Sequence, residues 1–156
     1  MCKSYYNSPV GVLEIICEKD ALISLKLVKN IEKTEQETAF IKTIKSQLKE
    51  YLLGQRQKFD IKINPKGTTF QKEVWKELLK ISYGKTKSYS EIAYAIGKPN
   101  SQRAVGFACN KNPIMIIIPC HRVISKNGEL GGFVYGNLIK HKLLELENYK
   151  LQISKG

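Results

Sequence analysis

The stretch Ile116–Val123 constrains the fold most strongly, because an apolar run leads directly into a cysteine, a histidine and an arginine. The apolar part is typical of a buried strand, and buried charged groups need partners. Side chains along a strand alternate between its faces, so Cys120 and His121 can cooperate only if the strand ends before them. Pro119 is suited to end it, because proline lacks an N–H group. On these residues alone, a reactive thiol beside His121 and a small core cysteine are equally good interpretations.

The first 63 residues predict a small structural domain of short strands and one helix. Apolar runs over residues 12–18 and 21–27 flank a turn signal and favour a hairpin with one solvated face. Residues 34–53 carry apolar side chains at spacings of three and four, which predicts a helix that Gly54 ends. Residues 59–63 predict a further strand. We find no catalytic constellation in this half of the sequence.

A turn-rich break at residues 64–67 predicts that a second domain spans residues 64–156. A helix is expected over residues 70–81, with Trp75 on its buried face. Two short helices should follow, the first capped by Ser90 and the second, residues 102–110, capped by Ser101. A Gly/Pro turn joins them, and this arrangement is typical of a helix-turn-helix whose second helix docks on DNA.

The last third of the chain predicts a hairpin, a flexible loop and a helix. Residues 125–128 end in Asn-Gly, the dipeptide that favours a tight hairpin turn. The glycine-rich and aromatic residues 131–136 are expected to form a wing or a loop that closes a pocket. A final helix is expected over residues 138–149.

The net charge of +12 favours a polyanionic partner such as nucleic acid. Nearly all of this charge is lysine, however, and a lysine-rich genome would produce the same excess. The four cysteines lack CxxC spacing and the sequence has two histidines, which argues against a disulfide framework and against a metal site. The N-terminus lacks a signal-peptide pattern, and no apolar run reaches the roughly 18 residues of a membrane span, so we expect an intracellular protein.

Motifs across the C-terminal half resemble those of the O6-alkylguanine-DNA alkyltransferases, also called methylated-DNA–protein-cysteine methyltransferases. They occur in the family's order and at its spacing. The Pro-Cys-His-Arg-Val block is the most specific of them. The matching residues are Phe70, Val74-Trp75, Tyr83-Gly84, Ser88-Tyr89, Arg103-Ala104-Val105-Gly106, Asn112-Pro113, Ile118-Pro119-Cys120-His121-Arg122-Val123, Gly128, Gly131-Gly132-Phe133, Gly136, Lys142-Leu143-Leu144 and Glu147.

The resemblance implies an α/β (α+β) fold. A small ribonuclease-H-like α/β domain, residues 1–63, would precede a winged helix-turn-helix domain, residues 64–156, that binds DNA and carries the active site. The N-terminal half fits the ribonuclease-H-like pattern only loosely, through residues 8–11. The implied partner is double-stranded DNA containing O6-alkylguanine, and O4-alkylthymine is a further candidate substrate. No cofactor, metal or membrane is implied, and we expect a cytoplasmic monomer.

The resemblance also implies a role for each matching residue. Cys120 would attack the alkyl carbon of a flipped base, and His121, held by Glu147, would draw the thiol proton through a water. Tyr89 would press on the rotated phosphate and protonate guanine N3. Asn112 and Arg122 would support the active site. On the recognition helix Arg103 would fill the vacated stack, and the remaining expected DNA contacts are Ser101, Ala104 and Gly106.

Because a thioether has no easy hydrolytic exit, we expect each protein molecule to react once. Val134 is a departure from the family pattern, and it is expected to narrow the pocket for bulky adducts. Three alternatives remain. One is a non-reactive relative that binds alkylated DNA and signals other repair, although such relatives replace the cysteine. The second is a winged-helix transcription regulator. The third is a cysteine hydrolase, and a hydrolase would need an oxyanion hole and a general base that is not the residue next to the cysteine.

Overall fold

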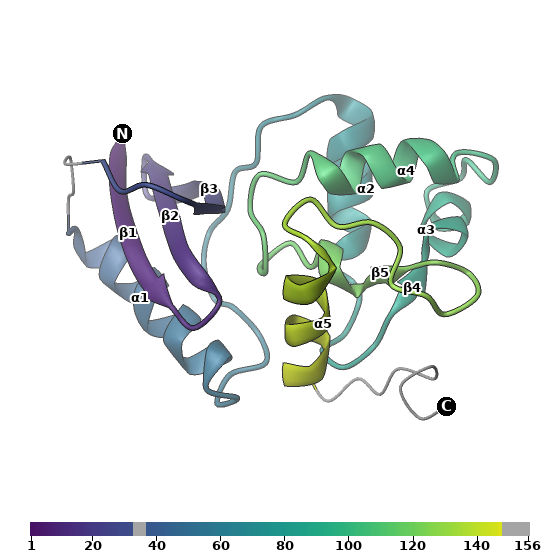
Figure 1. Cartoon of the computed structure of the whole chain (residues 1–156). Coiled ribbons are helices and arrows are strands. Elements are labelled where there is room, and N and C mark those ends of the chain that lie inside the picture. Colours follow the sequence, from purple (N-terminus) through teal and green to yellow (C-terminus); the bar gives the residue numbers. More distant parts are fainter. Residues whose placement is uncertain (33–36, 148–156) are drawn as a thin grey trace. The chain divides into compact units, whose positions relative to one another are not determined.

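Three antiparallel strands and a helix make up the first of two units in the computed structural model, which describes residues 1–32 and 37–147 (Figure 1). Unit 1 comprises Met1–Lys66 together with Pro113–Met115, and unit 2 comprises Gly67–Asn112 together with the residues from Ile116 onward. This α/β architecture agrees with the predicted fold class. None of the described helices is long and apolar enough to cross a membrane.

Unit 1 is a meander of three strands, β1 (Cys2–Ser8), β2 (Gly11–Glu18) and β3 (Ala21–Val28), in the order β1-β2-β3. Lys19 and Asp20 have φ values of 52° and 61°, which matches the tight turn that continues the twist of a hairpin. The helix α1 (Ala39–Leu52) buries its apolar side chains with those of the strands. The fully buried side chains of this core are Leu13, Ile15, Leu22, Leu25, Ile41, Ile44, Leu48 and Tyr51.

Two predictions for unit 1 need correction. The helix begins at Ala39 rather than Thr34, because the Thr38 side chain accepts a hydrogen bond from the Ile41 amide and caps it; residues 33–36 lie outside the described residues. The strand predicted over residues 59–63 is wrong, because only Ile63 pairs, in an isolated bridge with Leu22. A second bridge joins Ile114 to Leu25, so two short segments share the edge of β3.

Unit 2 contains four helices in its described part: α2 (Thr69–Leu78), α3 (Tyr89–Ala95), α4 (Gln102–Asn110) and α5 (Asn137–Leu146). The predicted helix 70–81 ends earlier, at Leu78, and the predicted end of the last helix, residues 148–149, lies outside the described residues. Trp75 is buried as expected, and its indole nitrogen donates a hydrogen bond to the Ala108 carbonyl at 2.8 Å. This bond ties α2 to α4, the second helix of the helix-turn-helix.

The caps of that helix pair differ from the prediction. Ser88, not Ser90, caps α3, because its hydroxyl accepts from the Glu91 amide while the Glu91 side chain accepts from the Ser88 amide. Ser101 occupies the cap position of α4, but its hydroxyl donates to the Lys98 carbonyl and makes no capping hydrogen bond. The sequence could not separate Ser88 from Ser90, since both precede the apolar face closely.

The apolar run before Cys120 is not a strand. Residues 115–117 form a turn and Ile118 a bend, and Ile116 has a φ of 70°, a conformation that β-branched residues rarely adopt. Cys120–Arg122 form a single 3-10 turn, and β5 (Val123–Ile124) then pairs in parallel with β4 (Lys87–Ser88). The turn at residues 125–128 exists, yet β5 pairs with β4 and not with a hairpin partner.

The capping geometry yields a stability prediction. Ser88→Ala should lower the free energy of unfolding by about 1 kcal/mol, because the Glu91 amide loses its partner at the start of α3. Ser90→Ala, inside the same helix, is the matched control and should change stability by less than about 0.5 kcal/mol. Urea unfolding followed by circular dichroism measures both, and an equal loss in the two variants would contradict the assignment of the cap.

Candidate active site

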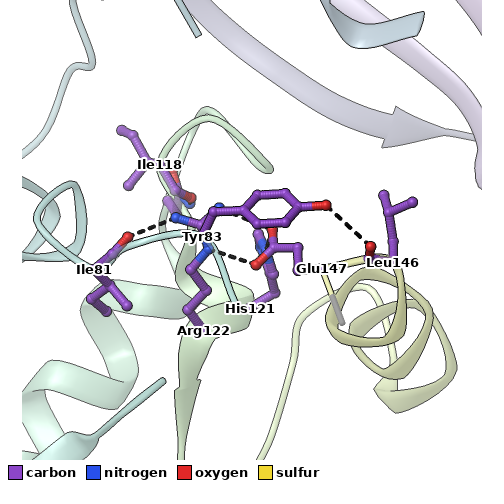
Figure 2. A network of polar contacts seen from close by, with 8 residues as sticks. Ile81, Tyr83, Ile118, His121, Arg122, Leu146 and Glu147 are labelled. Atoms are coloured by element: carbon purple, nitrogen blue, oxygen red, sulfur yellow. Dashed lines mark hydrogen bonds and ion pairs between the residues drawn. The ribbon is translucent and has the colours of Figure 1, made fainter. Parts of the chain in front are cut away.

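The Glu147 carboxylate lies at the centre of a buried polar cluster (Figure 2). Its Oε2 is 2.8 Å from His121 Nε2, and Arg122 donates to both of its oxygens, from Nε at 2.8 Å and from Nη2 at 3.0 Å. Arg122 Nη1 donates to the Ile81 carbonyl at 2.7 Å, and the Tyr83 ring lies 5.8 Å from the guanidinium. The cluster therefore joins the 3-10 turn Cys120–Arg122 to the end of α5 and to Ile81, which follows α2.

The same contacts set the protonation of this cluster. Burial alone would raise the pKa of Glu147, but hydrogen bonds from His121 and Arg122 outweigh it and lower that pKa to about 2. Burial lowers the pKa of His121, so its imidazole is neutral at pH 7. Because the ionised Glu147 can only accept, His121 Nε2 carries the proton and Nδ1 is left as an acceptor. Nδ1 is buried and has no hydrogen-bond partner in the structure.

Cys120 precedes this histidine and is almost fully buried, with 3% of its surface exposed. Burial raises the pKa of its thiol, while a hydrogen bond with Asn112 and the charge of Lys140 act in the opposite direction. Asn112 also donates to the Ile118 carbonyl at 2.8 Å, which fixes the turn that leads to Cys120. The thiol therefore keeps its proton at rest and needs a base to react.

Tyr89 begins α3 and contacts the loop over residues 130–136. Its hydroxyl donates to the Gly132 carbonyl at 3.4 Å, and burial raises its pKa to about 12, so it remains a proton donor. Gly131 has a φ of 70°, and a Cβ there would lie 3.0 Å from the Tyr89 hydroxyl oxygen. Gly106 of α4 lies on another side of the same ring, where a Cβ would be 3.9 Å away. Tyr89 thus lies between the loop and α4.

Lys140 is a site residue that the sequence patterns did not single out. Its side chain is fully buried, and its ammonium group donates to the carbonyls of Val123, Leu130 and Gly132, which joins α5 to β5 and to the loop. Burial lowers its pKa to about 8, so it stays charged at pH 7. A usable signal was present, because Lys140 shares the helical spacing of the buried Leu143 and Leu144 and must therefore face the core.

Apart from Tyr89 at the start of α3, the residues expected to bind DNA lie on α4 and at its start. Arg103 and Ala104 are exposed, and Ser101 and Gly106 are partly exposed, whereas the opposite face of the helix buries Val105, Ala108 and Cys109. Val134, which was expected to narrow a pocket, is 54% exposed on its loop. Among the described residues, no group of three His, Cys, Asp or Glu side chains could hold a metal ion.

A buried thiol followed by a glutamate-held imidazole, in the same unit as a helix-turn-helix, is the arrangement that the sequence predicted for a DNA-binding protein with a reactive cysteine. The sequence profile of the 6-O-methylguanine DNA methyltransferase DNA-binding domain matches residues 69–149, and the profile of that family's ribonuclease-like domain matches residues 1–65. The chain belongs to the 6-O-methylguanine DNA methyltransferase family.

Individual relatives agree with this assignment. The chain is 43% identical over 157 residues to a methylated-DNA–protein-cysteine methyltransferase of Methanosarcina barkeri, with 95% of the chain and 99% of the relative covered. A crystal structure of Mycobacterium tuberculosis OGT in complex with DNA is similar, with a TM-score of 0.88 and 41% identity over 94% of the chain and 92% of that protein. An O6-methylguanine DNA methyltransferase from Methanococcus jannaschii has a TM-score of 0.72 and 29% identity, with 94% of both chains covered.

The low pKa of Glu147 predicts how stability depends on pH. Its folded value of about 2 lies below the ordinary value of 4.5, so its contribution is complete above pH 4.5 and is lost as the pH falls toward 2. The expected loss across this interval is about 3 kcal/mol of unfolding free energy. Urea unfolding between pH 5 and pH 2 measures it.

Two variants isolate this contribution. Glu147→Gln should flatten the pH dependence and should lower stability at pH 7, because it leaves the buried Arg122 without a countercharge. Glu145→Gln, two residues away and exposed, should keep the wild-type slope. If Glu147→Gln retained the full slope, the carboxylate would not be the group that titrates.

Proposed function

We propose that this protein repairs DNA by moving the methyl group of O6-methylguanine to the sulfur of Cys120. The observation that carries the proposal is the buried pair formed by Cys120 and the partnerless His121 Nδ1, with Nε2 held by Glu147. A neutral imidazole fixed in this tautomer is a general base whose free nitrogen is ready for a proton. Membership of the methyltransferase family and the DNA-bound relative support the same reaction.

In this mechanism the thiol proton of Cys120 passes to His121 Nδ1 through a water molecule. The thiolate sulfur then forms a bond to the methyl carbon while the bond between that carbon and guanine O6 breaks. Tyr89 donates its hydroxyl proton to guanine N3, which makes the restored base a better leaving group. Asn112 and Lys140 lower the free-energy cost of forming the buried thiolate. The product is a thioether on Cys120, so each protein molecule reacts once.

Access to the alkyl group requires base flipping, because Cys120 is buried and O6 lies inside the paired duplex. The exposed Arg103 on α4 is suited to fill the vacated stack, and the small side chain of Ala104 and the bare backbone of Gly106 allow α4 to approach the duplex closely. Ser101, at the start of α4, would contact the DNA backbone. Tyr89, between α4 and the loop over residues 130–136, would press on the rotated nucleotide.

The alternative functions are less favoured. A non-reactive alkyl-DNA-binding protein would have no use for a thiol supported by a base, and the relatives with high coverage are named methyltransferases. A transcription regulator would not need the buried cluster of His121, Arg122 and Glu147. We propose a monomer that acts on genomic DNA in the cytoplasm, and the domain boundary after residue 63 stays a prediction.

The decisive experiment follows a labelled methyl group. With duplex DNA that carries a tritiated methyl group on guanine O6, the label should move to the protein until about one methyl group is bound per protein molecule. Cys120→Ala should abolish the transfer. Cys109→Ala, a second buried cysteine in the same unit, is the matched control and should transfer normally. Label that stays on tightly bound DNA would overturn the proposal, and so would transfer by Cys120→Ala.

The proposed base has its own pH signature. His121→Gln, which can still donate to Glu147, should slow methyl transfer at pH 7 by a factor of about 100 to 10,000. Because burial raises the pKa of Cys120, the rate of this variant relative to wild type should climb steadily from pH 7 to pH 9. The ratio of the two rates is compared because Lys140, with a pKa of about 8, loses its charge over this range in both proteins. His141→Gln is the control. Parallel pH profiles for wild type and His121→Gln would exclude His121 as the base.

A further inference from the structure

We propose that Phe107 is a second DNA-contacting side chain of α4, with its ring packed against the deoxyribose walls of the minor groove beside the damaged nucleotide. The inference rests on the proposed function and deepens it. It assigns an apolar contact to a chain whose other expected DNA contacts are polar, small or charged. The partner group is the sugar edge of duplex DNA, whatever the base sequence.

The starting observation is the exposure of an aromatic ring on an otherwise small and polar helix face. Phe107 is 65% exposed, while Val105, Ala108 and Cys109 fill the buried face of α4. A single exposed apolar residue is common on protein surfaces and carries no conclusion by itself. The position of Phe107 relative to Arg103 and to Tyr89 makes it informative.

Phe107 lies four residues after Arg103, so both side chains project from the same face, about 6 Å apart along the helix axis. Successive base pairs are about 3.4 Å apart. A helix that inserts Arg103 at the vacated position would therefore bring the Phe107 ring to the groove about two base pairs away. Gly106, which directly precedes Phe107, faces Tyr89, so this part of α4 adjoins the site where the extruded base must pass.

The chemistry of the neighbours favours the sugar walls over the base edges. Ala104 and Gly106 let the backbone approach closely, and Arg103 and Lys111 supply positive charge on either side of the ring. Proteins that bind DNA through the minor groove combine basic side chains with apolar ones such as phenylalanine. In the major groove an aromatic ring would instead contact thymine methyl groups and would read sequence.

The test compares three variants on duplex DNA and on free O6-methylguanine base. Phe107→Ala should lower the second-order rate of methyl transfer from duplex DNA about tenfold, because the ring loses the apolar area that it buries on the sugars, with the rate on the free base unchanged. Phe107→Leu, which keeps an apolar side chain, should recover most of the duplex rate. Tyr94→Ala is the matched control, since Tyr94 is an exposed aromatic residue of α3 (77% exposed) and should react like wild type.

Salt and flanking sequence distinguish the sugar contact from an ionic contact and from base readout. The Phe107→Ala defect should be equal at low and high salt, because no charge is lost, and equal whether thymine or cytosine flanks the lesion. A full duplex rate for Phe107→Ala would overturn the inference, as would an equal loss on the free base, an equal loss for Tyr94→Ala or a defect confined to thymine flanks. Failure of the proposed function is distinct, since wild type itself would then transfer no methyl group.

Discussion

The active site depends on the hydrogen bonds that the buried carboxylate of Glu147 accepts from His121 and Arg122. A buried carboxylate is costly unless it is paired and hydrogen-bonded. Here Arg122 donates two hydrogen bonds to it and His121 one, and the same three groups fix the tautomer of the imidazole, the direction of the 3-10 turn and the end of α5. Structure and reactivity therefore share one network: the guanidinium that stabilises the fold also keeps Glu147 ionised, and only an ionised Glu147 leaves Nδ1 of His121 free.

Burial and local charge act in opposite directions on the nucleophile. Burial keeps the Cys120 thiol protonated, which protects it from unproductive reactions, while Lys140 and Asn112 favour the thiolate once a base removes the proton. Lys140 itself is held by the carbonyls of Val123, Leu130 and Gly132, so its charge is partly neutralised by dipoles. The result is a thiol that keeps its proton in the free protein and whose proposed reaction depends on a base.

Periodicity and motif spacing predicted the two-part α/β architecture and the helix-turn-helix, because these features are local or rest on a family resemblance. The roles of the residues around Cys120 stay predictions. The errors occurred where tertiary contacts decide. The apolar run before Cys120 forms turns in which Ile116 is buried and has a φ of 70°, and hydrophobic periodicity gives no signal for such a backbone. The strand over residues 59–63 reduces to one bridge because Ile114 shares the edge of β3. Lys140 was not predicted as a site residue because lysine side chains are almost never fully buried.

The adjacent glycines at 131 and 132 of the loop over residues 130–136 differ in what a side chain would cost. At position 131 the backbone has a φ of 70°, and a Cβ would lie 3.0 Å from the Tyr89 hydroxyl oxygen and 3.2 Å from the Ser125 hydroxyl oxygen. At position 132 an added Cβ would meet no atom within 4 Å, and the carbonyl alone makes the contacts with Tyr89 and Lys140. The two positions therefore differ in their tolerance to substitution: a side chain at 131 strains the backbone and displaces its neighbours, whereas the space beside 132 is open.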